Sequence, residues 1–457
     1  MTKQAADDRW LFATLAAITV VTAIVSSLGA PLVPSISARY DVPLSTAQWV
    51  LTSPFIMAAA VTPVLGRWGS GRLRRPVLLA GLGVVLAGVV LAAIPISIGT
   101  LIAGRTLQGV GLALTPLTLA VARDVWTADR LTSRLSLLSI ATVSGAGLGY
   151  PITGLIAEHW GISGAYLFGS AMVALTLLLA SRFLPRQAHG DPQRVDLPSV
   201  VLISTGMVAT LLAVSQGELW GWTSLAVLGP AAGGVLLLAG WVVRTRRLSR
   251  GGGQPLVDLR LAVRAGVLGP NIVSFAIAIG MYGLLTLVVL LVRGDGTAGW
   301  GLGLGATEAG LVLVPYSLLS VTGSRLALRL ARRRGPHLLL PLGSTVFASA
   351  MALLAFRHGS FAEALLAMAI GGLGSGFTFS SLPSLIVPHV PQAETGSALA
   401  FNQLLRYLGF SVGSAVTVAL LEVYGGDLAA FRATALTMAG VCLLAAAGVA
   451  RRRVPTG

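Results

Sequence analysis

Charged side chains are scarce in this sequence of 457 residues. Asp, Glu, Lys and Arg make up 11% of it, whereas a soluble domain carries roughly 25%, and 55% of the residues are hydrophobic. A chain this apolar, with a mean hydropathy of +0.83, has too little polar surface to cover a globule in water. The composition therefore excludes an ordinary soluble protein and predicts one built of membrane-spanning helices.

Cysteine and lysine are nearly absent as well. The single cysteine, Cys442, lies in an apolar run, which excludes an intrachain disulfide. The one lysine is Lys3, so the net charge of +16 comes almost entirely from arginine. Because these arginines lie in short segments between apolar runs, they match the excess of positive charge found in cytoplasmic loops. We therefore expect no nucleic-acid partner.

Catalytic and metal-binding motifs are missing too. The five histidines are scattered near the ends of apolar runs, without the spacing of metal ligands. The sequence contains no His-Glu-x-x-His and no phosphate-binding Gly-x-x-x-x-Gly-Lys. We expect no metal, no cofactor, no enzyme activity and no ATP-driven transport by this chain alone.

Long apolar runs are what the sequence does contain. About 20 apolar residues span a bilayer as a helix, and fourteen runs of this kind predict an all-α polytopic protein. They lie near residues 10–34, 46–66, 76–97, 99–122, 134–157, 164–184, 197–216, 223–243, 267–292, 306–331, 337–356, 360–386, 397–421 and 428–450.

The positions of the basic residues test the topology. With the amino end inside and an even number of helices, 26 of the 32 Lys and Arg residues fall in cytoplasmic segments. The four in outer loops are Arg39, Arg293, Arg357 and Arg432. This asymmetry is what the positive-inside rule requires. We expect a multi-pass protein of the bacterial inner (cytoplasmic) membrane with both termini cytoplasmic.

An internal repeat relates the fourth run to the twelfth and the fifth to the thirteenth. A shift of 263 residues superposes Gly109 on Gly372, and a shift of 264 superposes Gly149 on Gly413. Chance among 56 glycines is the alternative, but duplicated six-helix halves are typical of secondary transporters. The predicted domains are an N-terminal six-helix bundle over 1–188, a two-helix insert with flanking loops over 189–264, and a C-terminal six-helix bundle with a short basic tail over 265–457.

Motifs along nearly the whole chain resemble one family. The fourth run reads Arg105-Thr-Leu-Gln108-Gly109-Val-Gly111, and the fifth contains Gly145, Gly147, Gly149, Pro151 and Gly154. Ser215-Gln-Gly-Glu-Leu-Trp220 follows between the seventh and eighth runs. Together they resemble the major facilitator superfamily, specifically its fourteen-helix drug:proton antiporter branch. The resemblance implies two six-helix bundles plus a two-helix insert, and proton-coupled export by alternating access.

Two departures from the family pattern concern acidic residues. The loop after the second run reads Gly66-Arg67-Trp68-Gly69-Ser70, and Ser70 stands where the family has an aspartate. The first run has no acidic residue in its inner half. Both losses remove the usual gating contact and the usual proton carrier.

Buried polar residues are the candidates for a substrate cavity. A charge inside a membrane costs several kcal/mol, so an intramembrane arginine is a functional candidate by default. Arg105 and Arg406 would hold a polar or anionic part of a substrate, with Gln108, Asn402 and Gln403 as hydrogen-bonding neighbours. In the structural alternative, each guanidinium binds backbone carbonyls of neighbouring helices.

No acidic residue lies at a clear mid-membrane position. Glu308 and Glu363, each about a turn into its helix, are the candidate proton carriers. The alternative for each is a solvated carboxylate at the membrane interface, which would bind protons without transporting them.

Small residues predict close helix contacts. Gly145, Gly147, Gly149 and Gly154 with Pro151 would let the fifth helix approach a neighbour and rock or bend against it; plain tight packing is the alternative. In the second loop Gly66, Arg72, Arg74 and Arg75 form a candidate cytoplasmic latch, and the alternative is that these arginines only set topology.

The function expected from these features is secondary active export of small amphipathic molecules, such as a drug, an antibiotic or a lipid-like metabolite. Expected partners are the small-molecule substrate, the lipid bilayer and protons, and the duplicated halves predict a monomer. Alternatives are an uptake transporter, an uncoupled facilitator for a metabolite, and a membrane sensor or enzyme without transport.

Overall fold

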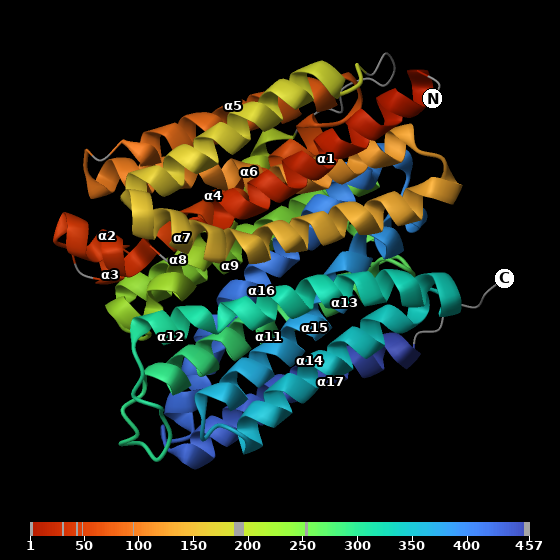
Figure 1. The fold of residues 1–457 in the computed structure, drawn as a ribbon. Helices are drawn as coiled ribbons and strands as arrows, with labels where there is room; N and C mark the ends of the chain where they lie inside the picture. The colour runs from red at the N-terminus through yellow and green to blue at the C-terminus, as the bar shows by residue number, and fades with distance from the viewer. Residues whose placement is uncertain are drawn as a thin grey trace. The chain divides into compact units, whose positions relative to one another are not determined.

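The computed structural model is helical throughout the residues that it describes, which are 3–29, 32–42, 44–47, 49–94, 96–186, 196–251 and 255–451. Figure 1 labels the helices. The long ones are α1 (Lys3–Ser27), α4 (Trp49–Trp68), α5 (Arg74–Ala93), α6 (Ile98–Val125), α7 (Ala128–Phe183), α8 (Leu197–Trp220), α9 (Leu225–Arg250), α11 (Leu268–Arg293), α13 (Leu313–Arg334), α14 (Leu339–Phe356), α15 (Phe361–Ile386), α16 (Thr395–Val423) and α17 (Leu428–Arg451). The short ones are α2 (Val33–Tyr40), α3 (Leu44–Ala47), α10 (Leu259–Ala262) and α12 (Ala306–Leu311).

Each of the fourteen predicted runs falls on a helix. The runs at 134–157 and 164–184 are merged into α7, whose backbone leaves helical geometry at Gly161, with φ 66°. A residue with a Cβ rarely adopts this conformation, so Gly161 divides α7 into two segments. The run at 306–331 is divided between α12 and α13.

Eleven helices in the described part of the chain are long and apolar enough to cross a membrane. Neither α6 nor α16 is among them. Both carry polar side chains along their length, Arg105 and Gln108 on α6 and Asn402, Gln403 and Arg406 on α16. The first segment of α7 is not among the eleven either, and the candidate cavity residues lie on α6 and α16.

The described contacts divide the chain into two compact units. Unit 1 contains Met1–Ala262 and Val390–Leu404, and unit 2 contains Val263–His389 and Leu405–Gly457. The two helices of the predicted insert, α8 and α9, belong to unit 1 together with the segment Val390–Leu404, which includes the first turns of α16. The boundaries predicted at 188 and 264 stay predictions.

Glycines separated by the repeat offset make equivalent contacts within the two units. A Cβ at Gly109 of α6 would lie 2.2 Å from the carbonyl oxygen of Pro54 on α4, and one at Gly372 of α15 would lie 2.0 Å from that of Tyr316 on α13. Only glycine permits such approaches, because a Cβ would clash with the backbone. Helices α4 and α6 of unit 1 therefore pack as α13 and α15 do in unit 2.

The fifth and thirteenth predicted helices repeat this behaviour. A Cβ at Gly145 of α7 would lie 2.6 Å from the carbonyl oxygen of Val20 on α1. One at Gly409 of α16 would lie 2.6 Å from that of Phe275 on α11. The matched contacts in two helix pairs explain why the glycine pattern recurs at offsets of 263 and 264 residues.

Candidate transport site and gate

Arg105 is the most buried charged residue among the predicted cavity residues, with 0% of its surface exposed. Its Nε donates to the carbonyl oxygen of Val50 on α4 at 2.9 Å. Its Nη1 donates to the carbonyl oxygen of Val25 on α1 at 2.7 Å and to Oε1 of Gln108 at 2.7 Å. The guanidinium thus joins α6 to α1 and α4, as the structural alternative predicts. A role in binding substrate stays a prediction.

Gln108 extends the same polar group to a fourth helix. Its Nε2 donates to the carbonyl oxygen of Gly88 on α5 at 3.1 Å. Arg105 and Gln108 lie three residues apart and therefore on one face of α6. The two residues that the sequence places together are brought into one hydrogen-bonded group linking α1, α4, α5 and α6.

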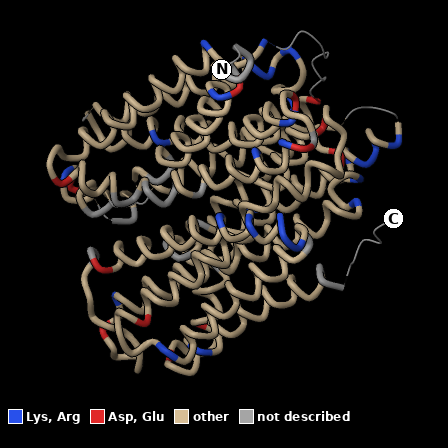
Figure 2. Tube along the Cα trace, turned by 45° about the vertical axis from the view of Figure 1, so that its right-hand side comes forward, with Lys and Arg blue, Asp and Glu red and all other residues tan. Residues whose placement is uncertain are grey.

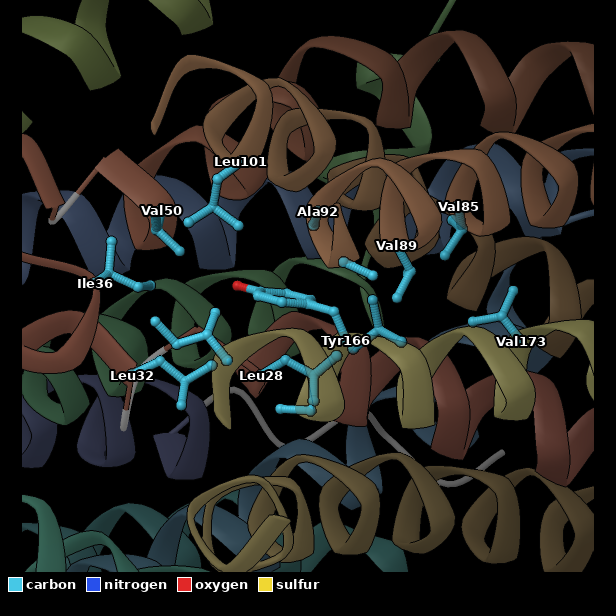
Figure 3. Close-up of a cluster of buried hydrophobic side chains, with 14 of the residues drawn as sticks. Leu28, Leu32, Ile36, Val50, Val85, Val89, Ala92, Leu101, Tyr166 and Val173 are labelled. Carbon is cyan, nitrogen blue, oxygen red and sulfur yellow. The ribbon is translucent and has the colours of Figure 1, made fainter. Parts of the chain in front are cut away.

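Tyr166 is a buried polar residue that the sequence reasoning missed. It lies in α7 within an apolar cluster that includes Leu28, Leu32 and Ile36, with 0% of its surface exposed. Figure 3 shows its hydroxyl directed toward the side of the cluster where Ile36 and Val50 lie. That hydroxyl has no hydrogen-bond partner. Buried hydroxyls are normally hydrogen-bonded. In the sequence, a tyrosine within an apolar run was the feature that could have marked Tyr166 as a buried polar residue.

The remaining cavity candidates lie on α16, on both sides of the boundary between the units. Asn402 is 5% exposed and belongs, with Gln403, to unit 1. Arg406 belongs to unit 2, where its guanidinium carbon lies 5.1 Å from the centre of the Phe379 ring. This is within the range of a cation–π contact. The grouping of these residues with Arg105 in one cavity stays a prediction.

The two candidate proton carriers lie at helix beginnings. Glu363 receives a hydrogen bond from the backbone N–H of Gly359 at 2.8 Å, while its own N–H donates to Oγ of Ser360 at 3.3 Å. Its carboxylate also lies 3.5 Å from Arg357, which is largely exposed. Glu308 lies in the first turn of α12. Both positions suit an interfacial carboxylate, and their role in proton transfer stays a prediction.

The glycine motif of the fifth predicted helix lies within α7. Gly145 contacts α1 as described above, whereas nothing lies within 4 Å of a Cβ at Gly154. Gly147, Gly149 and Pro151 lie on the same helix. Helical geometry persists through Pro151 and is interrupted at Gly161.

The arginines of the candidate latch bind within the first six-helix half. Arg74 is 3% exposed, pairs with Asp124 of α6, and donates to the carbonyl oxygen of Gly69 at 2.8 Å. Arg75 donates to the carbonyl oxygen of Ser181 on α7 at 2.6 Å. Arg72 lies on the short turn Gly71–Leu73 before α5 and is exposed. Arg74 and Arg75 thus fasten α5 to α6 and α7.

Gly66 makes a different contact, with the start of α16. A Cβ at Gly66 would lie 2.8 Å from Cβ of Ala400 and 3.3 Å from the carbonyl oxygen of Gly396. Gly66 thus places one of the predicted latch residues against the segment Val390–Leu404.

A buried ion pair at the same place was not predicted. Arg67, 1% exposed, binds both carboxylate oxygens of Glu394 through Nη1, at 2.8 and 3.1 Å. Arg123 donates to Oγ1 of Thr395 at 2.5 Å, and Gln392 donates to Oδ1 of Asp124 at 3.1 Å. The sequence offered one indication of the Arg67–Glu394 pair, because both residues were assigned to the same side of the membrane. They are 327 residues apart.

Arranged in this way, the residues hold helices together through buried hydrogen bonds and ion pairs. Among the residues that the structure describes, no group of three or more His, Cys, Asp or Glu could hold a metal ion. What the geometry offers is a buried polar group in an apolar bundle and an ion-paired contact at one end.

Comparisons with known proteins agree with this architecture. A model of the Major Facilitator Superfamily matches residues 15–413 and 271–457. The multidrug efflux pump LfrA of Mycolicibacterium smegmatis is 28% identical over 411 residues, covering 88% of this chain and 79% of LfrA. The cephamycin export protein CmcT of Amycolatopsis lactamdurans is 29% identical over 411 residues, covering 86% of this chain and 80% of CmcT. The human organic anion transporter MFSD10 shares the fold, with a TM-score of 0.69 at 15% identity over 96% of this chain and 99% of that one.

Proposed function

Because the chain belongs to the Major Facilitator Superfamily, we propose that it is a secondary transporter that exports small amphipathic molecules by alternating access. The observation that carries this proposal is the likeness to a multidrug efflux pump and an antibiotic export protein, each over more than four fifths of this chain. Export of a drug, an antibiotic or a lipid-like metabolite is therefore favoured over uptake.

The buried polar group supports a substrate of limited polarity. Val25 and Val50, whose carbonyl oxygens Arg105 binds, belong to a buried apolar cluster. A site lined mostly by apolar side chains with few polar points suits an amphipathic molecule. With arginine as the charged group, neutral or anionic compounds should be preferred over permanent cations. We assign Arg105 and Gln108 to this site, and Asn402, Gln403 and Arg406 stay candidates for substrate contact on α16.

We place the protein in the bacterial inner membrane with both termini in the cytoplasm. In Figure 2, Lys and Arg residues gather at the end of the unit 1 helices where the chain begins. Positive residues accumulate on the cytoplasmic side of membrane proteins, so this basic end of unit 1 faces the cytoplasm. One copy supplies both six-helix halves, and the transporter therefore functions as a monomer.

Proton coupling is the energy source that the family resemblance favours, with Glu308 or Glu363 as the carrier. The second candidate is an uncoupled facilitator. The absence of an acidic residue in the inner half of the first predicted helix, and the serine at position 70, favour that second candidate.

A susceptibility screen combined with vesicle transport tests the proposal. The chain is expressed in a strain lacking its own efflux pumps, and growth is measured across chemical classes. We expect resistance to neutral or anionic amphipathic compounds, and accumulation of the same compounds in inverted vesicles under an imposed pH gradient. Hypersensitivity would indicate uptake, transport indifferent to the gradient would indicate a facilitator, and no effect on any compound would overturn the export proposal.

A further inference from the structure

We propose that the two-helix insert, α8 and α9, is a working part of the gate at the basic end of unit 1, where it holds the first turns of α16 in the closed position. The proposal rests on alternating access as the mode of transport. It concerns α9, the loop after it, and the segment Val390–Leu404, all of which lie in unit 1.

The first observation is that α16 divides between the units. Its residues up to Leu404 pack in unit 1, and those from Leu405 onward pack in unit 2. When the units change their relative arrangement, a helix shared in this way either bends at the boundary or loses one set of contacts. The contacts of the segment Val390–Leu404 are therefore the ones expected to break and re-form in each cycle.

The second observation is that polar and backbone contacts from α4 and α6 hold this segment. Arg67 of α4 pairs with Glu394, and Arg123 of α6 donates to Thr395. Gly66 and Gly396 approach so closely that a Cβ at Gly396 would lie 3.1 Å from the carbonyl oxygen of Gly66. The Arg67–Glu394 ion pair thus joins α4 to the segment Val390–Leu404. Ser70, which stands where the family has an aspartate, carries no charge that could do so.

The third observation is that the insert contacts a neighbouring face of the same segment. Oγ of Ser397 donates to the carbonyl oxygen of Leu256, in the loop after α9, at 3.1 Å. The rings of Trp241 on α9 and Phe401 on α16 have centroids 6.4 Å apart. Trp241 is 5% exposed and Leu256 is 0% exposed. Trp241 of α9 and Leu256 therefore contact the segment together with α4 and α6.

The insert is itself fastened to the first bundle. Oγ of Ser204 on α8 donates to the carbonyl oxygen of Ala60 on α4 at 2.5 Å. Asp196, before α8, accepts two hydrogen bonds of 2.7 Å from Arg244 of α9. Because α8 is tied to α4 and α9 to α8, a contact from α9 transmits the position of the first bundle to α16.

Two buried polar atoms of α9 indicate that the closed contact is not the most stable arrangement possible. Nε1 of Trp241 and Oγ1 of Thr245 have no hydrogen-bond partner, and these residues lie four positions apart on one helix face. A buried donor without a partner costs free energy. The contact of α9 with the segment Val390–Leu404 is therefore weakened by this cost, which favours release of the segment.

Cross-linking tests the gate directly. In a Cys442→Ala background, Leu256→Cys with Ser397→Cys joins the insert loop to α16, and Ala60→Cys with Ser204→Cys joins α8 to α4. We expect the first cross-link to reduce transport at least about tenfold, reversibly by reductant, and the second to leave transport unchanged. Undiminished transport with the first pair fully cross-linked would overturn the proposal.

A labelling measurement needs no substrate and separates this proposal from the proposed function. Ser397→Cys is buried when the gate is closed, so its rate of reaction with a water-soluble maleimide reports opening. Trp241→Ala and Glu394→Gln should each raise that rate about tenfold. Trp241→Phe, and Arg67→Glu combined with Glu394→Arg, should restore the slow rate. Equal slow labelling in Trp241→Ala and in the parent would refute a gating role for the insert, whether or not a substrate is found.

Discussion

At the scale of single residues, the chain uses arginine in two distinct settings. Arg105 is enclosed by helices and satisfied by two carbonyls and Gln108, whereas Arg67 and Arg74 are buried beside carboxylates at the basic end of unit 1. A planar guanidinium presents five donors in fixed directions. It can therefore satisfy several carbonyls of different helices in fixed directions, whereas an ammonium group is a compact charge with three rotatable donors.

Arg105→Ala should abolish transport and also lower thermal stability. Three hydrogen bonds of the buried guanidinium would be lost, at about 1 kcal/mol each. Arg105→Lys should recover part of the stability and little of the transport, because lysine lacks the planar fork. The measurements are vesicle transport at matched expression and unfolding temperature in detergent, with the exposed Arg293→Ala as the control. Normal transport by Arg105→Ala would leave this residue a structural role alone.

Neutralising the proton carrier should abolish gradient-driven transport and spare energy-independent exchange of substrate. A carrier must bind a proton on one side of the membrane and release it on the other, so Glu308→Gln or Glu363→Gln should separate the two activities. Both are measured in inverted vesicles with and without a pH gradient, and Glu422→Gln, an exposed acid at the end of α16, is the control. Full gradient-driven transport in both variants would show that neither acid is the carrier.

At the scale of helices, some pairs are held by close glycine contacts and others by an ion pair. The approaches of α4 to α6 and of α13 to α15 depend on glycines whose offset repeats along the chain. The hairpin of α8 and α9 is instead tied by Asp196 and Arg244 at its basic end. Hydrogen bonds from Arg244 and Ser199 hold the pKa of the Asp196 carboxyl down at about 2, against an ordinary value of 3.8.

Asp196→Asn should therefore destabilise the hairpin in a pH-dependent way. Because the folded-state pKa is depressed, the contribution of the carboxylate is fully present above about pH 4 and is lost as the pH falls toward 2. Solvent screening limits it to about 1 kcal/mol at neutral pH. The unfolding temperature of the variant should be lower than that of the parent at pH 7, and the difference should shrink below pH 4. Asp129→Asn, at an exposed position in α7, provides the control; a difference that does not vary with pH would contradict the assignment.

At the scale of the whole molecule, the chain repeats one set of helix contacts in its two halves and adds a two-helix insert to one of them. Each six-helix half buries glycine-rich helix contacts, and the insert adds two helices to unit 1. In α9 of the insert, the large apolar side chains of Leu225, Val235 and Leu236 are largely exposed, as expected of a helix that faces lipid.

The proposed topology predicts which engineered cysteines label from outside the cell. In a Cys442→Ala background, Asp41→Cys in the segment between α2 and α4 should react with an impermeant maleimide in intact cells. Arg72→Cys, on the turn before α5, should react only after permeabilisation, because basic segments stay in the cytoplasm. The unsubstituted chain is the control, since its buried Cys442 should not react. Labelling of Arg72→Cys in intact cells would reverse the orientation.

The sequence alone determines the helices, the fold class and the repeat, because these depend on local composition. An apolar run of about 20 residues becomes a spanning helix wherever it lies, and a glycine permits close approach whatever its partner. The partners themselves were decided by tertiary structure. Arg67 with Glu394 and Trp241 with Phe401 are far apart in sequence, and no local pattern marks them as neighbours. The same holds for Arg105: the membrane cost of its charge identifies it from sequence, but the helices whose carbonyls satisfy that charge are known only once α1, α4 and α6 are packed together.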